Sequence, residues 1–434
     1  MGSYNPSERA IATLLDRYPR IKTGLKSTYQ RANYYAFGDR TFEYELHPDV
    51  VLGTPEEQFG VPFSRNELFF GYFDVSPWNR SMDRAIYHAP RPDGDADIVL
   101  YQEAERRTLA SSATWNYQQG SRLQWHPTRD DRILFNDVDP NLSCSDETRP
   151  IESLVTRVIN PNGAEQKRFS MPLQSMSPTG DEFLSISYRR LDRNRPDYGY
   201  EIDDGASLPS PDRDGLWQVQ MDSGSSELLV SLSELIDETP SSGEEQYDHH
   251  YLNHALYDPT GEQAVFMHRW QDKKGRTSRL YIINRDGDDR RLLIDNRIVS
   301  HYCWLDADRL FVWGRLEGYG SGYYIVDVSK DEIDLVPVLN RYSDGHPSVS
   351  PDGRWIIADT YPDRSRKRSL ILYDLDKEEL TTVGNFFAPL EFTGEQRCDL
   401  HPRFSPNGTA VSIDSVHNGR RYSYTLDINS LIEP

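Results

Sequence analysis

Apolar and polar positions alternate along most of the chain in short runs, and these runs recur as one pattern. In each copy an apolar segment is followed by a turn of the Ser-Pro-Asp-Gly type and then by an apolar strand. The clearest copies are HPSVSPDGRWIIADT, residues 346–360, and HPRFSPNGTAVSIDS, residues 401–415. Proline fixes φ at the turn, and the Asp/Asn-Gly pair reverses the chain between two antiparallel strands. The pattern therefore predicts a chain built from β-hairpins.

The turn recurs seven times, and its anchor positions are Pro77, Pro127, Pro178, Pro259, Asp306, Pro351 and Pro406. Successive anchors lie 45–55 residues apart except for one gap of 81 residues. A regular spacing near 50 residues indicates one supersecondary unit per repeat. A second alternating strand pair, such as residues 369–383, follows several of the turns. The sequence thus predicts an all-β fold, a seven-bladed β-propeller of four-stranded antiparallel blades, which hides sheet edges by radial repetition.

Two segments fall outside the repeat. Residues 1–45 are predicted to form an N-terminal arm with a helix near Ser7–Leu15, which either closes the ring or covers one face, and residues 46–434 are predicted to form the propeller. The long gap contains an insertion at about 190–250 that is rich in Pro, Gly, Ser and acidic residues. It is expected to form loops around a hairpin at Leu216–Leu229. Long loops on a rigid scaffold often carry function, and a tolerated insertion is the alternative.

Four consecutive repeats carry histidine five residues before the turn anchor. The residues at this position are, in chain order, Tyr72, Arg122, Leu173, His254, His301, His346 and His401. The chain has 11 histidines, so four in register are poorly explained by chance. The first strand of each propeller blade lines the channel, so these side chains are expected to converge. Four imidazoles facing one space suit a divalent metal or an acid–base site, and hydrogen bonds between blades are the alternative.

Further residues with metal-binding side chains lie close to this register. Cys303 follows His301, and Gln396, Cys398 and Asp399 precede His401. A thiolate ligand would favour Zn, whereas small buried core residues are the alternative for the cysteines. The chain has three cysteines, Cys144, Cys303 and Cys398, and such a small, odd number argues against a disulfide framework.

Arginine, tyrosine and other polar residues gather at the ends of the predicted strands opposite the turns. They include Gln118, Gln119, Arg122, Tyr188, Arg189, Arg190, Arg193, Arg195, Tyr198, Tyr200, Asp248, His249, His250, His268 and Arg269. Each alone fits a solvated loop or a bond between blades. Together they give one mouth of an otherwise acidic protein an excess of arginine and tyrosine. That excess predicts an anionic ligand, such as the carboxylate of a uronic acid.

The segment EQRCDLHPRFSPNG, residues 395–408, resembles a stretch of the oligogalacturonate lyases. In that family a Gln-x-x-His-x-His-Pro stretch binds Mn in a seven-bladed propeller. This chain matches at Gln396 and His401, has Asp399 in place of the middle histidine, and offers His346 for the family's further ligand from an earlier blade. Aspartate can also bind a hard divalent ion. The chain is similar as well to the ulvan lyases, which use channel-facing His, Tyr and Arg.

The resemblance implies β-elimination on an oligo- or polysaccharide that contains uronic acid. A metal or Arg neutralises the carboxylate, and a base removes the adjacent proton. We assign His254 as the base and Arg269 as the carboxylate partner, with His268 and Tyr188 as further catalytic candidates. Mn or Zn is assigned to His301, His346, Gln396 and His401. The residues assigned to the anionic oligosaccharide are Arg122, Gln119, Arg189, Tyr198, Tyr200 and His250.

Composition narrows the alternatives. The net charge of −21 argues against a nucleic-acid partner, and no run approaches 18 apolar residues, which argues against a membrane span. The N-terminus has no secretory-signal pattern, so we expect a cytoplasmic protein, a monomer or a small homo-oligomer. A non-catalytic TolB-like propeller that binds a glycan or a protein is the main alternative. A hydrolase would need paired carboxylates, for which Asp248, Asp399 and Glu395 are available, and no Gly-x-Ser-x-Gly elbow supports a peptidase.

Overall fold

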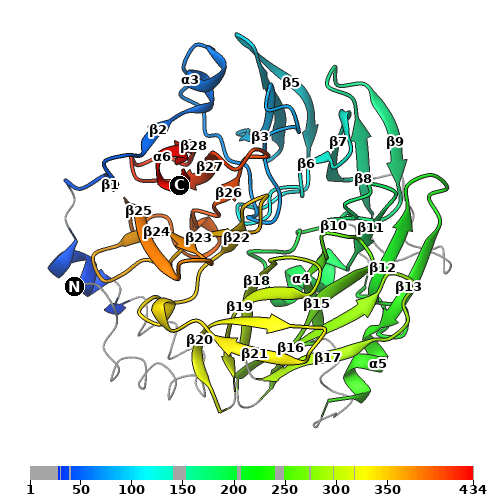
Figure 1. Cartoon of the computed structure of the whole chain (residues 1–434). Helices are drawn as coiled ribbons and strands as arrows, with labels where there is room; N and C mark the ends of the chain where they lie inside the picture. Colours follow the sequence, from blue (N-terminus) through cyan, green and yellow to red (C-terminus); the bar gives the residue numbers. More distant parts are fainter. Residues whose placement is uncertain are drawn as a thin grey trace.

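In the part of the chain that the computed structural model describes, seven antiparallel sheets surround a central channel (Figure 1). The described residues are 28–29, 31–38, 41–139, 153–202, 207–239, 249–272, 275–296, 298–316 and 318–433. The predicted seven-bladed β-propeller is therefore confirmed. The predicted helix near Ser7–Leu15, Cys144 and Asp248 lie outside the described residues.

The blades follow one another along the chain. Blades one to three contain β3 (Arg84–Pro90), β4 (Ala96–Gln102) and β5 (Glu105–Ser112); β6 (Gln124–His126), β7 (Arg129–Val138), β8 (Leu154–Ile159) and β9 (Glu165–Phe169); and β10 (Ser175–Met176), β11 (Glu182–Ser185), β12 (Gly215–Gln220) and β13 (Ser226–Ser231). Blades four and five contain β14 (Tyr251–Tyr257), β15 (Gln263–Asp272), β16 (Gly275–Asn284) and β17 (Arg291–Asn296); and β18 (Ile298–Trp304), β19 (Arg309–Leu316), β20 (Gly320–Asp327) and β21 (Glu332–Leu335). Blades six and seven contain β22 (Pro347–Val349), β23 (Trp355–Asp359), β24 (Lys367–Asp374) and β25 (Glu379–Phe387); and β26 (Arg403–Phe404), β27 (Ala410–Ser415) and β28 (Tyr422–Asp427).

The repeated turn owes its sequence to hydrogen bonds within the turn itself. In blade six the Ser350 carbonyl accepts from the Gly353 amide, and the Ser350 hydroxyl accepts from the Trp355 amide at 2.9 Å. Gly353 has φ of 74°, a left-handed conformation that glycine adopts without steric cost. Blade seven repeats this arrangement, with Ser405 bonded to the Gly408 and Ala410 amides. The serine and glycine of the motif thus fix the hairpin between the first two strands of these blades.

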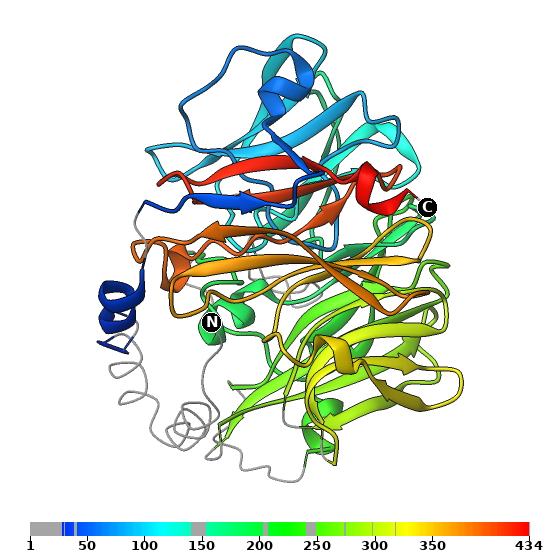
Figure 2. The same ribbon diagram turned by 60° about the vertical axis from the view of Figure 1, so that its left-hand side comes forward.

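The N-terminal part of the described chain completes the last two blades. β2 (Val51–Gly53) pairs antiparallel with β28 and is the outermost strand of blade seven, and β1 (Tyr44–Leu46) pairs with β25 as a fifth strand of blade six. Figure 2 shows both blue strands beside these red and orange blades. The segment just after the predicted arm therefore closes the ring, because β2, near the N-terminus, is the outermost strand of the blade that the C-terminal part of the chain forms.

The insertion in blade three contains more regular structure than the predicted loops. The predicted hairpin is β12–β13, the outer half of the blade. Two helices were not predicted: α4 (Tyr188–Asn194) starts at an N-cap serine, Ser187, and α5 (Leu232–Asp237) starts with a capping box between Ser231 and Glu234. The Ser-x-x-Glu spacing of that box was visible in the sequence.

The remaining short helices among the described residues are α3 (Pro55–Phe59), α6 (Asn429–Ile432), η3 (Pro337–Leu339), η4 (Gly394–Gln396) and a helical stretch at residues 31–37. Among the helices that the structure describes, none has the length and apolar character needed to cross a membrane.

The core is divided into layers between neighbouring blades rather than gathered at one centre. Val265 of blade four packs in one cluster with Val312 of blade five, and Leu134 of blade two packs in another with Phe183 of blade three. Polar side chains also join the blades. Asp359 at the end of β23 accepts from the Leu400 amide of blade seven. These contacts hold the strand ends, and hence the channel residues, in fixed positions.

Candidate functional site

The four register histidines converge in the channel, as the repeat predicts. The ring centroids of His301 and His346 lie 4.1 Å apart, and those of His346 and His401 lie 4.3 Å apart. The ring of Tyr72 lies between two of them, with its centroid 5.1 Å from that of His254 and 5.2 Å from that of His401. All five side chains are buried. The space that the four histidines surround is thus filled by an aromatic side chain from blade one.

Blade one supplies this side chain because it departs from the four-stranded pattern. Its ladder contains three strands, and its inner edge is joined within the described residues by two isolated bridges, Phe69↔His88 and Trp78↔Ala85. Between the bridges, residues 70–77 leave the sheet. We call Tyr72, Phe73 and Asp74 of this excursion the plug. The Phe73 ring also lies against the histidines, with centroids 5.3 Å from His254 and 5.4 Å from His346.

The plug is held at both ends by buried charged groups. Asp414 accepts from the amides of Phe70 and Gly71, each at 3.1 Å. Gly71 has φ of 127°, and a Cβ there would lie 2.8 Å from the backbone of blade two. At the other end, Arg122 makes a bidentate pair with Asp74, at 3.0 and 2.8 Å. The register residue Arg122 therefore fastens the plug.

Three register positions share an unusual backbone conformation. Arg122, His254 and His401 have φ of 55°, 48° and 44°. Such left-handed residues cost about 1–3 kcal/mol each and persist only where the surroundings impose the conformation, and they cluster at functional sites. Here the surroundings do impose the conformation at His401, whose amide donates to Asp359 at 3.1 Å.

Hydrogen bonds fix the orientation of the two histidines of blades six and seven. His346 bonds through Nδ1 to Asp359 at 2.9 Å, and His401 bonds through Nδ1 to the Gly71 carbonyl at 2.9 Å. With Nδ1 donating in both, each Nε2 carries the lone pair. Burial lowers the pKa of His346, but Asp359 and Asp399 outweigh burial and raise the pKa overall. Burial and the His346 charge hold the pKa of His401 well below its usual range.

His346, Asp399 and His401 form a cluster that could hold a metal ion. Their ligand atoms all lie within 4.8 Å of one another, and all three residues are buried. His346 Nε2, His401 Nε2 and Asp399 Oδ1 are buried atoms without a hydrogen-bond partner among the described residues. Two imidazoles and a carboxylate oxygen are a donor set suited to Mn, Fe or Zn. The buried, unbonded atoms therefore fit a divalent cation.

The cluster differs from the predicted ligand set. Asp399 belongs to it, whereas Gln396 is an exposed residue of η4 and His301 lies outside it. Asp399 is flanked by two guanidinium groups, Arg368 Nη1 at 2.7 Å from Oδ1 and Arg397 Nε at 2.8 Å from Oδ2. These cations hold the pKa of Asp399 well below its usual range despite its burial. Gln396 as a ligand stays a prediction.

Cys303 and Cys398 are buried and protonated at neutral pH. Burial raises the pKa of the Cys398 thiol to about 12 and raises that of Cys303 further. Both residues belong to hydrophobic clusters. The structure therefore favours the core interpretation of the cysteines over a thiolate ligand.

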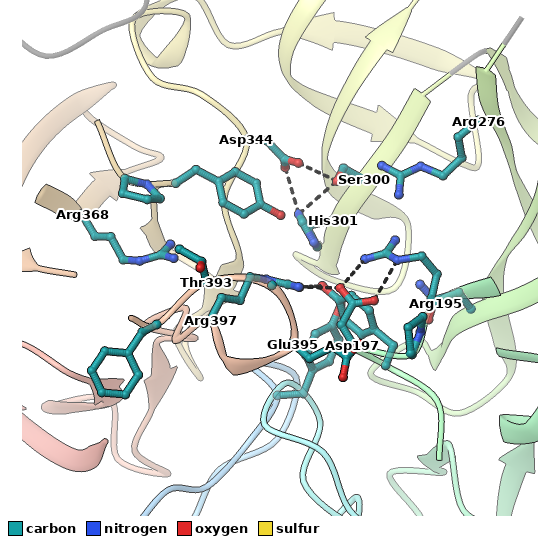
Figure 3. Close-up of a pocket in the computed structure, with 18 of the residues that line it drawn as sticks. Arg195, Asp197, Arg276, Ser300, His301, Asp344, Arg368, Thr393, Glu395 and Arg397 are labelled. Carbon is teal, nitrogen blue, oxygen red and sulfur yellow. Dashed lines mark hydrogen bonds and ion pairs between the residues drawn. The ribbon is translucent and has the colours of Figure 1, made fainter. Parts of the chain in front are cut away.

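His301 is arranged differently from the metal cluster. Its Nδ1 bonds to Asp344 Oδ1 at 2.9 Å, and Ser300 donates to the other oxygen of Asp344 at 2.6 Å (Figure 3). Burial lowers the pKa of His301 to about 4 even though Asp344 opposes the shift. The neutral ring with Nδ1–H on a carboxylate leaves Nε2 as a base. This pairing has the geometry of a histidine oriented for proton transfer.

Beside His301 lies a cavity of about 580 Å³, which we call the arginine mouth (Figure 3). Its lining residues are Tyr72, Arg195, Pro196, Asp197, Tyr198, Asn253, Arg269, Arg276, Ser300, His301, Asp344, Tyr361, Pro362, Arg366, Arg368, Phe392, Thr393, Gly394, Glu395 and Arg397. Six arginines face three carboxylates. The cavity is therefore cationic in a protein of net charge −21.

Two of these arginines have no carboxylate partner among the described residues. Arg269 is buried and donates to the backbone carbonyl of Val299 at 2.8 Å, while its Nε has no bond. Arg276, at the start of β16, reaches the cavity in Figure 3. Arg276 is partly exposed at the rim of the cavity, and desolvation there, with repulsion from Arg269 and Arg195, lowers its pKa. Unpaired guanidinium groups that repel one another form a site for an anion.

The insertion of blade three forms one wall of the arginine mouth. Arg195 pairs with both oxygens of Asp197 at 3.0 Å, and Asp197 also pairs with Arg397 of blade seven. Arg397 donates to the Tyr198 hydroxyl at 3.0 Å. The predicted ligand-binding residue Tyr198 thus lines the cavity, and the insertion is fastened there by ion pairs from the opposite side of the ring.

Other predicted site residues are hydrogen-bonded elsewhere in the fold and are absent from the described lining of the arginine mouth. Tyr188 donates to the Leu173 carbonyl and stacks on Tyr200, with centroids 4.4 Å apart. His250 and His268 are buried and bonded to each other at 3.0 Å. These side chains bond to one another or to other blade residues inside the fold, and the structure does not bring them to the cavity.

The remaining predicted residues, His254, Gln119 and Arg189, lie near the site but are absent from the described lining of the cavity. His254 is buried, and its Nε2 lies 3.7 Å from Asp74 Oδ2 of the plug. Burial lowers the pKa of His254 to about 3. The Gln119 amide donates to the Tyr198 carbonyl at 3.4 Å, and Arg189 of α4 donates to the Ile202 carbonyl at 3.4 Å.

A second set of hollows, the proline mouth, lies at the opposite ends of the same strands. Volumes of about 400 and 280 Å³ are lined by the plug residues Phe73 and Asp74 and by residues of the repeated turns, including Pro259, Ser348, Pro351 and Pro406. The plug thus separates two mouths of one channel. The sequence placed Tyr72 in the register without a role at the site. It gave Asp359 no role at all, although Asp359 and Asp414 each follow a register histidine by 13 residues.

The fold and this channel define a seven-bladed β-propeller with a cationic mouth, and solved structures share the fold. An oligogalacturonate lyase from Vibrio parahaemolyticus matches with a TM-score of 0.60 at 13% identity, covering 90% of this chain and 98% of that chain. An oligogalacturonate lyase in complex with manganese matches with a TM-score of 0.57 at 15% identity, covering 83% and 90%. At these identities the likeness shows the fold alone. No family model and no curated protein matches the sequence.

Proposed function

We propose that this protein is a lyase that cleaves a short oligosaccharide containing uronic acid by β-elimination at the arginine mouth. The observation that carries the proposal is the placement of a neutral, carboxylate-oriented histidine, His301, in the same cavity as an unpaired buried cation, Arg269. A cavity of about 580 Å³ is within the range that encloses small ligands. The propeller that it shares with two oligogalacturonate lyases supports the proposal at the level of the fold.

The residues divide the reaction among themselves. Arg269 binds the uronate carboxylate and offsets the negative charge that develops when the neighbouring C5 proton leaves. His301 Nε2 accepts that proton, with Asp344 stabilising the imidazolium. The electron pair forms the C4=C5 double bond, and the C4–O4 bond breaks. His301 replaces His254 as the base because His254 is absent from the described lining of the cavity.

Tyr72 is the proton donor for the departing O4. Its side chain lines the cavity, and its hydroxyl bonds to none of the described residues. Burial, together with the neighbouring Tyr198 and Asp74, raises the pKa of Tyr72 well above its usual range. The hydroxyl is therefore protonated at neutral pH, which suits a donor and excludes a base.

His346, Asp399 and His401 would hold a divalent cation, with Mn or Zn as the candidates. Such an ion would supply positive charge that stabilises the anionic ligand. Tyr72 and Arg368 line the cavity and also contact the cluster, so they connect it to the ligand.

The test is incubation of the protein with di-, tri- and tetrauronides, with and without added Mn²⁺, and detection of the unsaturated product by its ultraviolet absorbance. We expect product from wild type and a loss of about 10²–10³-fold in kcat/KM for Arg269→Gln. Arg107→Gln on the outer strand of blade one is the charge-matched control and should keep full activity. Binding of the uronides without product would contradict the lyase and leave a glycan-binding propeller.

A further inference from the structure

Arg368 is a buried cation in contact with the candidate metal cluster. It lies at the start of β24, is 3% exposed and lines the arginine mouth (Figure 3). Its Nη1 lies 2.7 Å from Asp399 Oδ1 and donates to the Thr360 carbonyl at 3.3 Å. Its Nε has no hydrogen-bond partner among the described residues. The guanidinium is therefore placed beside Asp399 with little else to hold it.

The contact with Asp399 is one of charge rather than an aligned hydrogen bond. Asp399 Oδ1 remains without a hydrogen-bond partner among the described residues although Arg368 Nη1 is near. Arg397 differs, because its Nε donates a hydrogen bond to Asp399 Oδ2 at 2.8 Å and its Nη groups bond to Asp197 and Tyr198. Of these two cations on Asp399, Arg368 has fewer bonds to lose if it moves.

The oxygen that Arg368 contacts is also the oxygen that a metal ion would use. His346 Nε2 and His401 Nε2 complete the donor set, and each is a buried atom without a hydrogen-bond partner among the described residues. A divalent ion binds a carboxylate oxygen at about 2.0–2.2 Å, so it would lie close to the Arg368 guanidinium. Two cations so close in a buried site repel each other strongly.

We propose that Arg368 is a built-in competitor for the metal: it neutralises Asp399 in the metal-free protein and moves away from Asp399 when an ion binds. The inference rests on the metal part of the proposed function and not on the lyase reaction. Displacement has a direction, because Arg368 lines the arginine mouth. Metal binding therefore adds a free guanidinium to the cavity that receives the anionic ligand, and by linkage the ligand strengthens metal binding.

The competition is tested by titrating metal-free wild type, Arg368→Gln and Arg269→Gln with Mn²⁺ alone and measuring Kd by calorimetry. Arg368→Gln should bind Mn²⁺ at least about tenfold more tightly than wild type, because it removes the competing charge. Arg269→Gln removes one cation from the same cavity without touching Asp399, so it controls for long-range charge and should stay within about threefold. A His346→Ala/His401→Ala variant defines the background.

Thermal unfolding supplies a second readout that does not depend on activity. Metal-free Arg368→Gln should have a lower Tm than wild type, because Asp399 loses one of its two cations, and Mn²⁺ should restore it by more than it raises wild type. Equal Mn²⁺ affinity in wild type and Arg368→Gln would overturn the competition and leave the metal site standing. If none of the proteins binds Mn²⁺ above the background variant, both the competition and the metal part of the proposed function are wrong. Failure of uronide cleavage alone would affect neither.

Discussion

The two mouths of the channel are built from opposite ends of the same strands, yet they differ in almost every chemical respect. The proline mouth consists of copies of one turn whose polar groups bond within the turn, as Ser350 does with Gly353 and Trp355. The arginine mouth consists of strand ends that differ from blade to blade and of the insertion of blade three, and it contains two arginines without a carboxylate partner in the described part of the chain. The repeat therefore conserves structure at one end of each blade and leaves the other end free to acquire a site.

The largest effect is expected at His301, the proposed catalytic base in the arginine mouth. His301→Asn keeps a polar side chain of similar shape but removes the proton acceptor, and we expect kcat for uronide cleavage to fall about 10³-fold. Steady-state kinetics with a diuronide measures it. An effect on KM with kcat intact would mean that His301 binds ligand without taking the proton.

The next effect concerns the buried pair that fastens the plug. Asp74→Asn leaves Arg122 charged and buried without its partner, at 1% and 2% side-chain exposure, and should destabilise the protein by about 3–5 kcal/mol in urea unfolding. Asp306→Asn at the proline mouth breaks an exposed pair with Arg309 and should cost less than about 1 kcal/mol. Similar losses in both variants would contradict the structural role of the plug.

A third prediction concerns pH. The pKa of His301 is about 4 in the folded protein and near 6.5 when unfolded, so the unfolded chain binds more protons between these values. Stability should therefore fall as the pH drops from about 6.5 to 4, and His254, with a pKa of about 3, acts in the same direction. His346, whose pKa is raised, opposes them.

Thermal unfolding against pH measures this dependence. His301→Asn should reduce the slope between pH 6.5 and 5 by about 1 kcal/mol per pH unit. An unchanged slope would mean that His301 contributes nothing to the acid sensitivity of the fold.

The smallest effect is expected for a substitution at the proline mouth, which serves as the comparison for those in the arginine mouth. Ser348→Ala removes a hydroxyl that lines this mouth and should change the free energy of unfolding by less than about 0.5 kcal/mol and leave uronide cleavage within twofold of wild type. A large loss of activity would show that the second mouth takes part in the reaction.

The repeat predicted the propeller because its signals are local. In blades three, six and seven a serine, a proline and a glycine within four residues fix the first hairpin, and the spacing of all seven turn anchors gives the number of blades. The histidine register followed from the same periodicity. A structural role for Asp359 beside His346 could also have been predicted, because Asp414 stands at the same distance in sequence from His401 as Asp359 does from His346.

The remaining site residues had no local signal. Arg397 meets Asp197 across 200 positions of sequence, and nothing near either residue predicts the other. The exposed position of Gln396 was also hidden, because η4 turns it outward while Asp399, three residues later, enters the cluster. The register position of blade one carries Tyr72 instead of a histidine, which already distinguished this blade. However, only tertiary packing shows that residues 70–77 leave the sheet and enter the channel.

The plug makes the channel a dead end. Tyr72 faces the arginine mouth, while Phe73 and Asp74 face the proline mouth, so a sugar chain cannot thread through the molecule. A ligand that enters the arginine mouth must therefore leave by the same mouth. A long polymer can present no more than an end or a short stretch to His301. In the proposed lyase, product release through the arginine mouth would then limit turnover, because arginines there bind the carboxylates of the products.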